Sequence, residues 1–222
     1  KYGKQTVKDA IEELLDRSER MMRREIEKMP DGVYHGSATL EDPGKGIGDC
    51  EVKATVTIQG DRMKIQLASR KQVPSYVNMY PAFTLSAMYY GILYYLEDAR
   101  LPHNAGSYRP IEMDFGPQGT MLNAQIPAAC AYSPNLDNIR DAICEALSQA
   151  LPERATGGFN HGPGLIFYGR DPRRDEPYVY LCIEHILGGG GARAGKMDGW
   201  HCTGIACAGG AITSANMELL EY

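Results

Sequence analysis

The sequence has no long run of basic residues. Its 222 residues include 23 Lys and Arg against 28 Asp and Glu, which gives a formal net charge of -5 at pH 7. Nucleic acids and anionic membranes attract proteins through positively charged surfaces. We therefore expect neither nucleic acid nor membrane as a partner, and we favour a small molecule or another protein.

Long apolar runs are also missing. The longest apolar stretch, around Phe83 to Leu96, is shorter than the roughly 20 residues that a membrane-spanning helix needs, and it is rich in tyrosine. We see no signal peptide before the first helical pattern. These features predict a soluble, cytoplasmic protein.

Cysteine is too sparse for a framework of disulfides. Small secreted domains held by disulfides carry cysteines at much higher density. The thiols are therefore expected to be reduced. The six cysteines are Cys50, Cys130, Cys144, Cys182, Cys202 and Cys207.

The two ends of the chain are unusual. Lys1 leads directly into a helical pattern without an initiator methionine, and Tyr222 closes on what reads as the middle of a strand. We expect a piece of a longer polypeptide or a processed subunit. No internal repeat or low-complexity linker divides residues 1–222, so the sequence marks no internal domain boundary.

Three segments have the apolar spacing of helices. The first runs from Thr6 to Met29 and is stopped by Pro30-Asp31-Gly32. The second runs from about Phe83 to Ala99 and ends before Pro102. The third begins at Ser133-Pro134, an N-cap followed by proline, and ends at Pro152.

Other segments alternate apolar and polar residues, as strands do. Cys50 to Leu67 predicts a hairpin that turns at Gly60-Asp61, and Val33-Tyr34-His35 starts a further β segment. Gly116-Pro117-Gln118-Gly119 predicts the turn of another hairpin. The remaining expected strands are Ile111 to Phe115, Thr120 to Leu122, Leu165 to Tyr168, Tyr178 to Ile186 and Ile212 to Leu220. The fold class is α+β, with antiparallel hairpins, three main helices and a glycine-rich loop region.

The glycine-rich segment from Gly188 to Gly210 contains an imperfect phosphate-binding loop. Gly190 to Lys196 matches glycine, four residues, glycine and lysine, but Met197 stands where Mg²⁺ binding needs Ser or Thr. We therefore favour a ligand or subunit contact at Gly189, Gly190, Gly191 and Arg193 over nucleotide binding.

Cysteine and histidine also occur in a spacing that resembles a zinc site only loosely. Cys182 and His185 lie three residues apart on an expected strand, so their side chains point to opposite faces. His201, Cys202 and Cys207 do not complete a standard ligand spacing. We assign no metal to this chain.

Three polar residues are candidates for substrate binding. His161 lies in a polar loop, where an imidazole can act as a general base. Arg109 and Asn123 could orient an anionic or amide substrate, although Arg109 could equally pair with Glu112 or Asp114. The spacing of these residues names no reaction, and the catalytic residues stay unknown.

Six phrases, taken in order, resemble the hydantoinase B/oxoprolinase family over essentially the whole length of the chain. They are Pro30-Asp31-Gly32-Val33-Tyr34, Thr84-Leu85-Ser86-Ala87-Met88-Tyr89-Tyr90, Pro102-His103-Asn104-Ala105-Gly106-Ser107-Tyr108-Arg109-Pro110-Ile111, Leu122-Asn123 with Pro127-Ala128-Ala129, Gln149-Ala150-Leu151-Pro152-Glu153-Arg154 and Gly188-Gly189-Gly190-Gly191-Ala192-Arg193.

The resemblance implies one part of an ATP-dependent enzyme. Members of the family work beside a hydantoinase A-type subunit that binds ATP, and they include 5-oxoprolinase, N-methylhydantoinase and ketone carboxylases. ATP with Mg²⁺ would phosphorylate an oxygen of the amide or enolised ketone at that partner. The expected assembly is a hetero-oligomer that hydrolyses cyclic amides or carboxylates small ketones. The segments from Trp200 to Cys207 and from Ala208 to Asn216 look closer to the ketone carboxylases.

The same resemblance limits what this chain can hold. The family's metal-associated stretch, an Asn-Asp-Pro segment followed by glycines and a histidine, lies upstream of every phrase present here. A divalent metal is therefore expected in an upstream part, and the chain is expected to be the C-terminal portion of a B-type subunit, inactive when isolated. The alternative is a non-catalytic scaffold that docks the ATP-binding partner.

Overall fold

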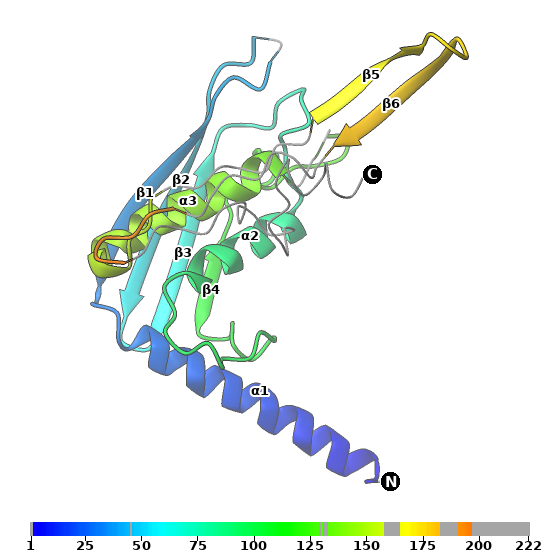
Figure 1. The fold of residues 1–222 in the computed structure, drawn as a ribbon. Helices are drawn as coiled ribbons and strands as arrows, with labels where there is room; N and C mark the ends of the chain where they lie inside the picture. The colour runs from blue at the N-terminus through cyan, green and yellow to red at the C-terminus, as the bar shows by residue number, and fades with distance from the viewer. Residues whose placement is uncertain are drawn as a thin grey trace. The chain divides into compact units, whose positions relative to one another are not determined.

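The computed structural model describes residues 2–44, 46–128, 130, 133–157, 165–182 and 191–196, with the backbone alone for residues 133–134, 165–167 and 180–182. The chain divides into two compact units, Lys1–Ala155 and Thr156–Tyr222. The first unit holds three helices and a four-stranded sheet, and the second holds a two-stranded sheet (Figure 1). The predicted α+β class is confirmed.

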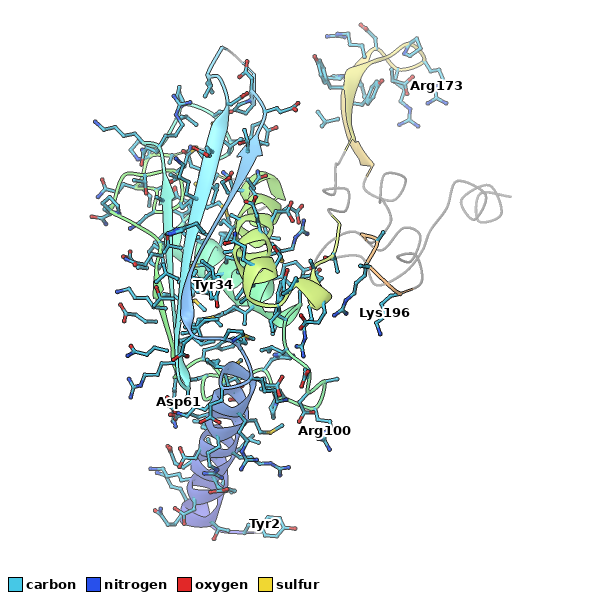
Figure 2. The ribbon with its side chains drawn as sticks, turned by 90° about the vertical axis from the view of Figure 1, so that its left-hand side faces the viewer. Tyr2, Tyr34, Asp61, Arg100, Arg173 and Lys196 are labelled. Atoms are coloured by element: carbon cyan, nitrogen blue, oxygen red, sulfur yellow. The ribbon has the colours of Figure 1, made fainter. Side chains whose placement is uncertain are left out.

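Helix α1 (Lys4–Ile26) covers most of the first predicted helix. Met22 and Ile26 in its last turns are fully buried in the core of the first unit. Beyond Ile26 the chain continues in turns through Met29, which is also buried. Figure 2 shows Asp61 near this end of the helix, where its carboxylate accepts a hydrogen bond of 2.8 Å from Arg23 Nη1.

The main sheet contains β1 (Gly32–Leu40), β2 (Cys50–Gln59), β3 (Arg62–Ser69) and β4 (Ile111–Asp114), in that order across the sheet. The first two pairings are antiparallel, which confirms the hairpin turning at Gly60-Asp61. Alternate side chains of β2 and β3 are buried, as their period-two pattern predicts. The register places Val56 opposite Ile65, so the apolar faces of the two strands coincide.

Helices α2 (Pro81–Leu93) and α3 (Ser133–Ala150) form the second layer, followed by the short helix η1 (Pro152–Arg154). Helix α3 packs on β1 and β2, and α2 packs against α3 (Figure 1). The third predicted helix is confirmed at both ends. Ile139, Ile143 and Leu147 of its apolar stripe are fully buried.

Helix α2 ends earlier than predicted, at Leu93 rather than near Ala99. The cause is a buried carboxylate on another helix. Glu25 of α1 is 4% exposed, and its Oε2 accepts hydrogen bonds from the backbone amides of Glu97 at 2.5 Å and Asp98 at 3.2 Å. Because a buried carboxylate must be hydrogen-bonded, the chain after Leu93 leaves the helix and turns these amides toward Glu25.

The predicted hairpin around Gly116-Pro117-Gln118-Gly119 is wrong. β4 pairs in parallel with β3, Met121 and Leu122 lie in a turn, and Thr120 forms only isolated bridges, with Lys71 and Asn123. The backbone of Met121 bonds elsewhere: its amide donates to Arg70 O at 2.9 Å, and its carbonyl accepts from Met79 N at 2.7 Å. Contacts with these distant segments replace the local pairing that the turn residues indicated.

In the second unit, β5 (Leu165–Asp171) and β6 (Glu176–Cys182) form an antiparallel hairpin. Tyr178 lies across Gly169, where a Cβ would sit 3.3 Å from the tyrosine ring. The two predicted strands are confirmed as far as Cys182. Residues 183–186 and the expected strand from Ile212 to Leu220 lie outside the described residues. Within the described residues, no helix is long and apolar enough to cross a bilayer.

Candidate functional site

Arg109 lies against α1. Its Nη1 donates to Asp16 Oδ1 at 2.7 Å and to Glu19 Oε2 at 3.2 Å. These hydrogen bonds raise the pKa of the Arg109 guanidinium. The carboxylates that pair with Arg109 are therefore these two, rather than Glu112 or Asp114 as considered from the sequence.

Asn123 holds the turn that follows β4. Its side-chain Nδ2 donates to Gly116 O at 2.8 Å, and its backbone carbonyl accepts a hydrogen bond from Gly119 N at 2.8 Å. Gly116 and Gly119 have φ of 84° and 87°, a region that favours glycine. Asn123 thus bonds to one tight turn through its side-chain amide at Gly116 and through its backbone carbonyl at Gly119. Asn123 and Arg109 each serve a different segment.

The glycine-rich candidates are described only in part. His161, Gly189 and Gly190 lie outside the described residues. Thr156 and Arg193 form an antiparallel bridge, and Gly157 N donates to Ala192 O at 2.7 Å. A Cβ on Gly191 would overlap the carbonyl of Gly157, so this glycine allows the two backbones to approach closely.

Helix α3 carries a buried ion cluster. The Arg140 side chain is fully buried and pairs with Asp137 at 2.7 Å and Asp141 at 2.7 Å. Burial opposes its charge, but the two carboxylates outweigh burial, so the pKa of the Arg140 guanidinium is raised. The sequence places Arg140 beside the apolar stripe of α3 but gives no signal of its complete burial.

Two tyrosines of the α2 region contribute to the same electrostatic environment. Tyr90 and Tyr94 share a hydrogen bond of 2.7 Å between their hydroxyls, with ring centroids 5.4 Å apart. Burial, and then the bond to Tyr90, raise the pKa of Tyr94, while the charge of Arg140 opposes the shift. Burial also raises the pKa of the Cys144 thiol to about 12.

These shifts decide what the cluster can do. Tyr94 and Cys144 stay protonated at neutral pH, and Arg140 stays charged. A general acid or base needs a pKa near the working pH, and a nucleophilic cysteine needs its thiolate. None of these three groups meets those conditions, so none of the three is a candidate for proton transfer or nucleophilic attack at neutral pH.

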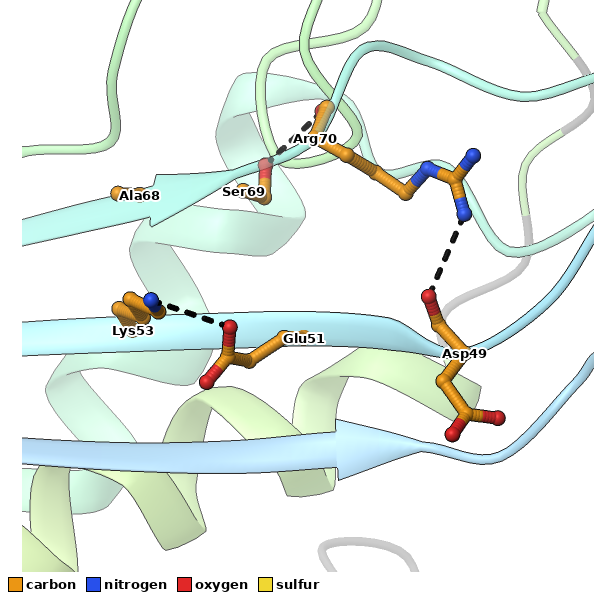
Figure 3. Close-up of a pocket in the computed structure, with 6 residues that line it drawn as sticks. All are labelled: Asp49, Glu51, Lys53, Ala68, Ser69 and Arg70. Carbon is orange, nitrogen blue, oxygen red and sulfur yellow. Dashed lines mark hydrogen bonds and ion pairs between the residues drawn. The ribbon is translucent and has the colours of Figure 1, made fainter.

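A shallow depression of about 410 Å³ opens at one end of the β2–β3 hairpin (Figure 3). Its charged residues are already engaged. Lys53 pairs with Glu51 at 3.2 Å, and Arg70 donates to the carbonyl of Asp49 at 3.3 Å. A ligand here would have to break these contacts, so the depression is a weak candidate for a substrate site.

Metal ligands do not gather among the described residues. No group of three or more His, Cys, Asp and Glu side chains in that part of the chain could hold an ion. Cys50, Cys130 and Cys144 are free thiols. Of the loose zinc pattern, His185, His201, Cys202 and Cys207 lie outside the described residues. The described residues therefore do not fit a bound metal.

The described residues define an α+β protein in which Arg109 and Asn123 hold segments of the fold together. The family model for Hydantoinase B/oxoprolinase matches residues 1–222, and the chain belongs to this family.

Two curated relatives are similar in sequence. The chain is 39% identical over 226 aligned residues to the beta subunit of the caprolactamase of Pseudomonas jessenii, covering 100% of this chain and 38% of that protein. It is 32% identical to a protein described as the B-type subunit of a D-/L-hydantoinase from Pseudomonas sp. (strain NS671), covering 88% of this chain and 34% of that protein. The chain thus spans well under half the length of these relatives.

Solved structures share the fold. The crystal structure of the ATP-dependent caprolactamase from Pseudomonas jessenii matches with a TM-score of 0.77 and 36% identity, covering 90% of this chain and 35% of that one. The nucleotide-free acetone carboxylase matches with a TM-score of 0.65 and 16% identity, covering 80% of this chain and 26% of that one. The second likeness shows the fold alone.

The described phrases that carry the family resemblance make packing contacts. Asn104 Nδ2 donates to Ser18 Oγ at 2.8 Å, and Thr84 Oγ1 donates to Leu122 O at 2.6 Å. Tyr89 stacks on Tyr108 with ring centroids 3.6 Å apart. These residues join segments that are distant in sequence. Their pattern can therefore be specific to the family's fold without identifying a reaction.

Proposed function

We propose that residues 1–222 form the C-terminal portion of the B-type subunit of an ATP-dependent, multi-subunit enzyme that hydrolyses a cyclic amide. The observation that carries this proposal is the 39% identity to a caprolactamase subunit over the whole chain. The second relative is also described by a cyclic-amide activity. Caprolactam and hydantoin are both cyclic amides, so the two names favour a cyclic amide as the substrate class here.

Hydrolysis is favoured over ketone carboxylation. The likeness to acetone carboxylase rests on 16% identity and supports only a shared fold. The segments from Trp200 to Cys207 and from Ala208 to Asn216, which look closer to ketone carboxylases, lie outside the described residues. Carboxylation is therefore the second candidate, and substrate assays separate the two.

In the proposed enzyme, ATP binding and metal binding take place on different polypeptides. ATP and Mg²⁺ would bind a hydantoinase A-type partner, where phosphorylation activates the amide oxygen. A divalent metal would bind a part of the B-type subunit outside residues 1–222. This chain contributes the sheet and helices that support that part, while His161 and the segment from Gly189 to Arg193 stay candidates for a ligand or subunit contact.

The proposal is tested with the complete subunit and its A-type partner. ATP hydrolysis is measured with lactams, 5-oxoproline and hydantoins, and with ketones plus bicarbonate. We expect a cyclic amide to stimulate ATP hydrolysis only when both subunits are present. If a ketone stimulates ATP hydrolysis and bicarbonate is consumed, the result would support carboxylation instead. No stimulation by any of these compounds would favour a non-catalytic scaffold.

For Arg109 we propose a structural role, and one substitution tests it. Arg109→Gln in the assembled enzyme is expected to leave kcat/KM within about twofold, because the guanidinium already binds Asp16 and Glu19. A charged hydrogen bond to substrate would cost about tenfold or more in kcat/KM. Asp16→Asn is the matched control, since it removes one of these ion pairs from the other side and leaves the contact between Arg109 and Glu19. A tenfold loss in Arg109→Gln alone would contradict the structural role.

A further inference from the structure

An apolar stripe lies open on the free half of α1. Val7, Ile11 and Leu14 are 49%, 51% and 49% exposed. Steps of four and three residues place them on one face of the helix. We call these three residues the α1 stripe. A single exposed leucine needs no explanation, but three aligned aliphatic residues form a surface that water solvates poorly.

The stripe continues a face that is buried further along the helix. Ser18 and Met22 follow Leu14 at steps of four residues, and both are 0% exposed. In Figure 1 the second half of α1 meets the first unit, whereas the N-terminal half projects beyond the end of the sheet. Figure 2 shows Tyr2 at the far end of this projection. The same helical face is thus covered along one half only.

The base of the projecting half is held firmly. Gly106 packs directly on the backbone of Leu15, where a Cβ would lie 2.6 Å from the carbonyl carbon. Asn104 and Arg109 add hydrogen bonds to Ser18 and Asp16. These contacts fix the direction of α1, so the stripe is presented on a helix whose orientation is already set.

The size of the stripe indicates what kind of surface covers it. Half-exposed Val, Ile and Leu side chains leave roughly 100–200 Å² of apolar area to bury. A stable contact between separate proteins needs about 800 Å² on each partner. A segment of the same polypeptide needs far less, because it does not lose the translational freedom of a separate molecule.

We propose that the α1 stripe is covered, in the complete subunit, by a segment of the same polypeptide outside residues 1–222. This inference rests on the proposed function, in which the chain is part of a longer B-type subunit. More than half of the length of the caprolactamase's beta subunit lies outside the matched region, which is ample for such a segment.

The covering segment has a defined chemistry. It presents aliphatic side chains to Val7, Ile11 and Leu14, and carboxylates toward Lys4 and Lys8 at the rim of the stripe. Charged groups at such a rim set orientation more than affinity. In this arrangement α1 is a strut that joins the framework described here to the remainder of the subunit.

Cysteine labelling in the complete subunit tests the proposal. Ile11→Cys and Arg17→Cys are compared in their reaction with maleimide, with the wild-type protein giving the background of native thiols. Arg17 is an exposed residue of the same helix outside the stripe. We expect Ile11→Cys to react at least about tenfold more slowly, because labelling requires the covering segment to open.

A paired stability measurement adds a second readout. In the complete subunit, Ile11→Gln/Leu14→Gln is expected to lower the Tm by about 3 °C or more. The control Glu12→Gln/Arg17→Gln, at two exposed positions outside the stripe, is expected to change it little. Glutamine is a good helix former, so α1 itself is preserved.

Several outcomes would contradict the proposal that a segment of the same polypeptide covers the stripe. Equal labelling of Ile11→Cys and Arg17→Cys in the complete subunit would show that the stripe is open. Protection of Ile11→Cys from maleimide that appears only after the A-type partner is added would assign the stripe to an intermolecular contact. Protection that appears only when light scattering shows a dimer would do the same. These readouts do not depend on activity, so failure of the amide-hydrolysis assay leaves them interpretable.

Discussion

Arg140→Met is expected to lower the free energy of unfolding by about 3–5 kcal/mol, the range found when one partner of a buried ion pair is removed. The wild-type Arg140 side chain is fully buried, and its partner Asp137 is only 2% exposed. Methionine fills much of the same volume but leaves the Asp137 carboxylate without this cation in a poorly solvated position. Chemical denaturation measures the loss.

The pH dependence of that loss identifies its cause. Burial without a paired cation raises the pKa of a carboxyl group above its value in the unfolded chain. The folded variant then binds more protons than the unfolded one, so its stability falls as pH rises. We expect the deficit of Arg140→Met relative to the wild type to be larger at pH 8 than at pH 5.

Two controls separate charge from packing. Arg140→Met/Asp137→Leu removes both charges and is expected to recover much of the lost stability, as apolar replacements of buried ion pairs do. Arg20→Met breaks an exposed pair with Glu13 and is expected to cost no more than about 1 kcal/mol. A deficit in Arg140→Met that is independent of pH and unchanged in the double variant would refute an electrostatic origin.

The burial of Arg140 marks the limit of sequence-based prediction for the candidate site. The sequence shows an arginine beside an apolar stripe, where a long side chain ordinarily reaches solvent. Its burial depends on how α3 packs with the rest of the chain. The partners of Arg109 are equally hard to predict from the sequence, because Asp16 and Glu19 lie about 90 positions earlier.

The local elements were more predictable. Period-two alternation found the β2–β3 hairpin, and the Ser133-Pro134 start with the Pro152 stop found α3. These signals lie within each segment and need no distant partner. The predicted hairpin after β4 failed because the backbone of Met121 bonds to Arg70 and Met79 instead. The strand partner of the residues beyond a turn depends on contacts throughout the fold, and the sequence of the turn does not encode it.

Gly36→Ala is the second substitution with a large expected effect, a loss of about 3 kcal/mol in the free energy of unfolding. Gly36 lies on the inner side of β1, where α3 crosses the strand. A Cβ there would overlap the carbonyl oxygen of Ala142 and lie 2.6 Å from the amide nitrogen of Ala146. Both are backbone atoms of a helix and cannot rotate away, so the alanine methyl must push α3 off the sheet.

The sign of the effect is diagnostic, because alanine is ordinarily more favourable than glycine within a strand by roughly 0.5–1 kcal/mol. A loss of about 3 kcal/mol corresponds to a Tm lower by about 6–12 °C for a chain of this size. Ser37→Ala is the matched control, since the next residue of β1 is exposed and faces away from α3. Unchanged or raised stability in Gly36→Ala would mean that α3 does not approach β1 this closely. The family pattern would then be compatible with a larger distance between α3 and the sheet than the distance that places the charges of α3 in the interior.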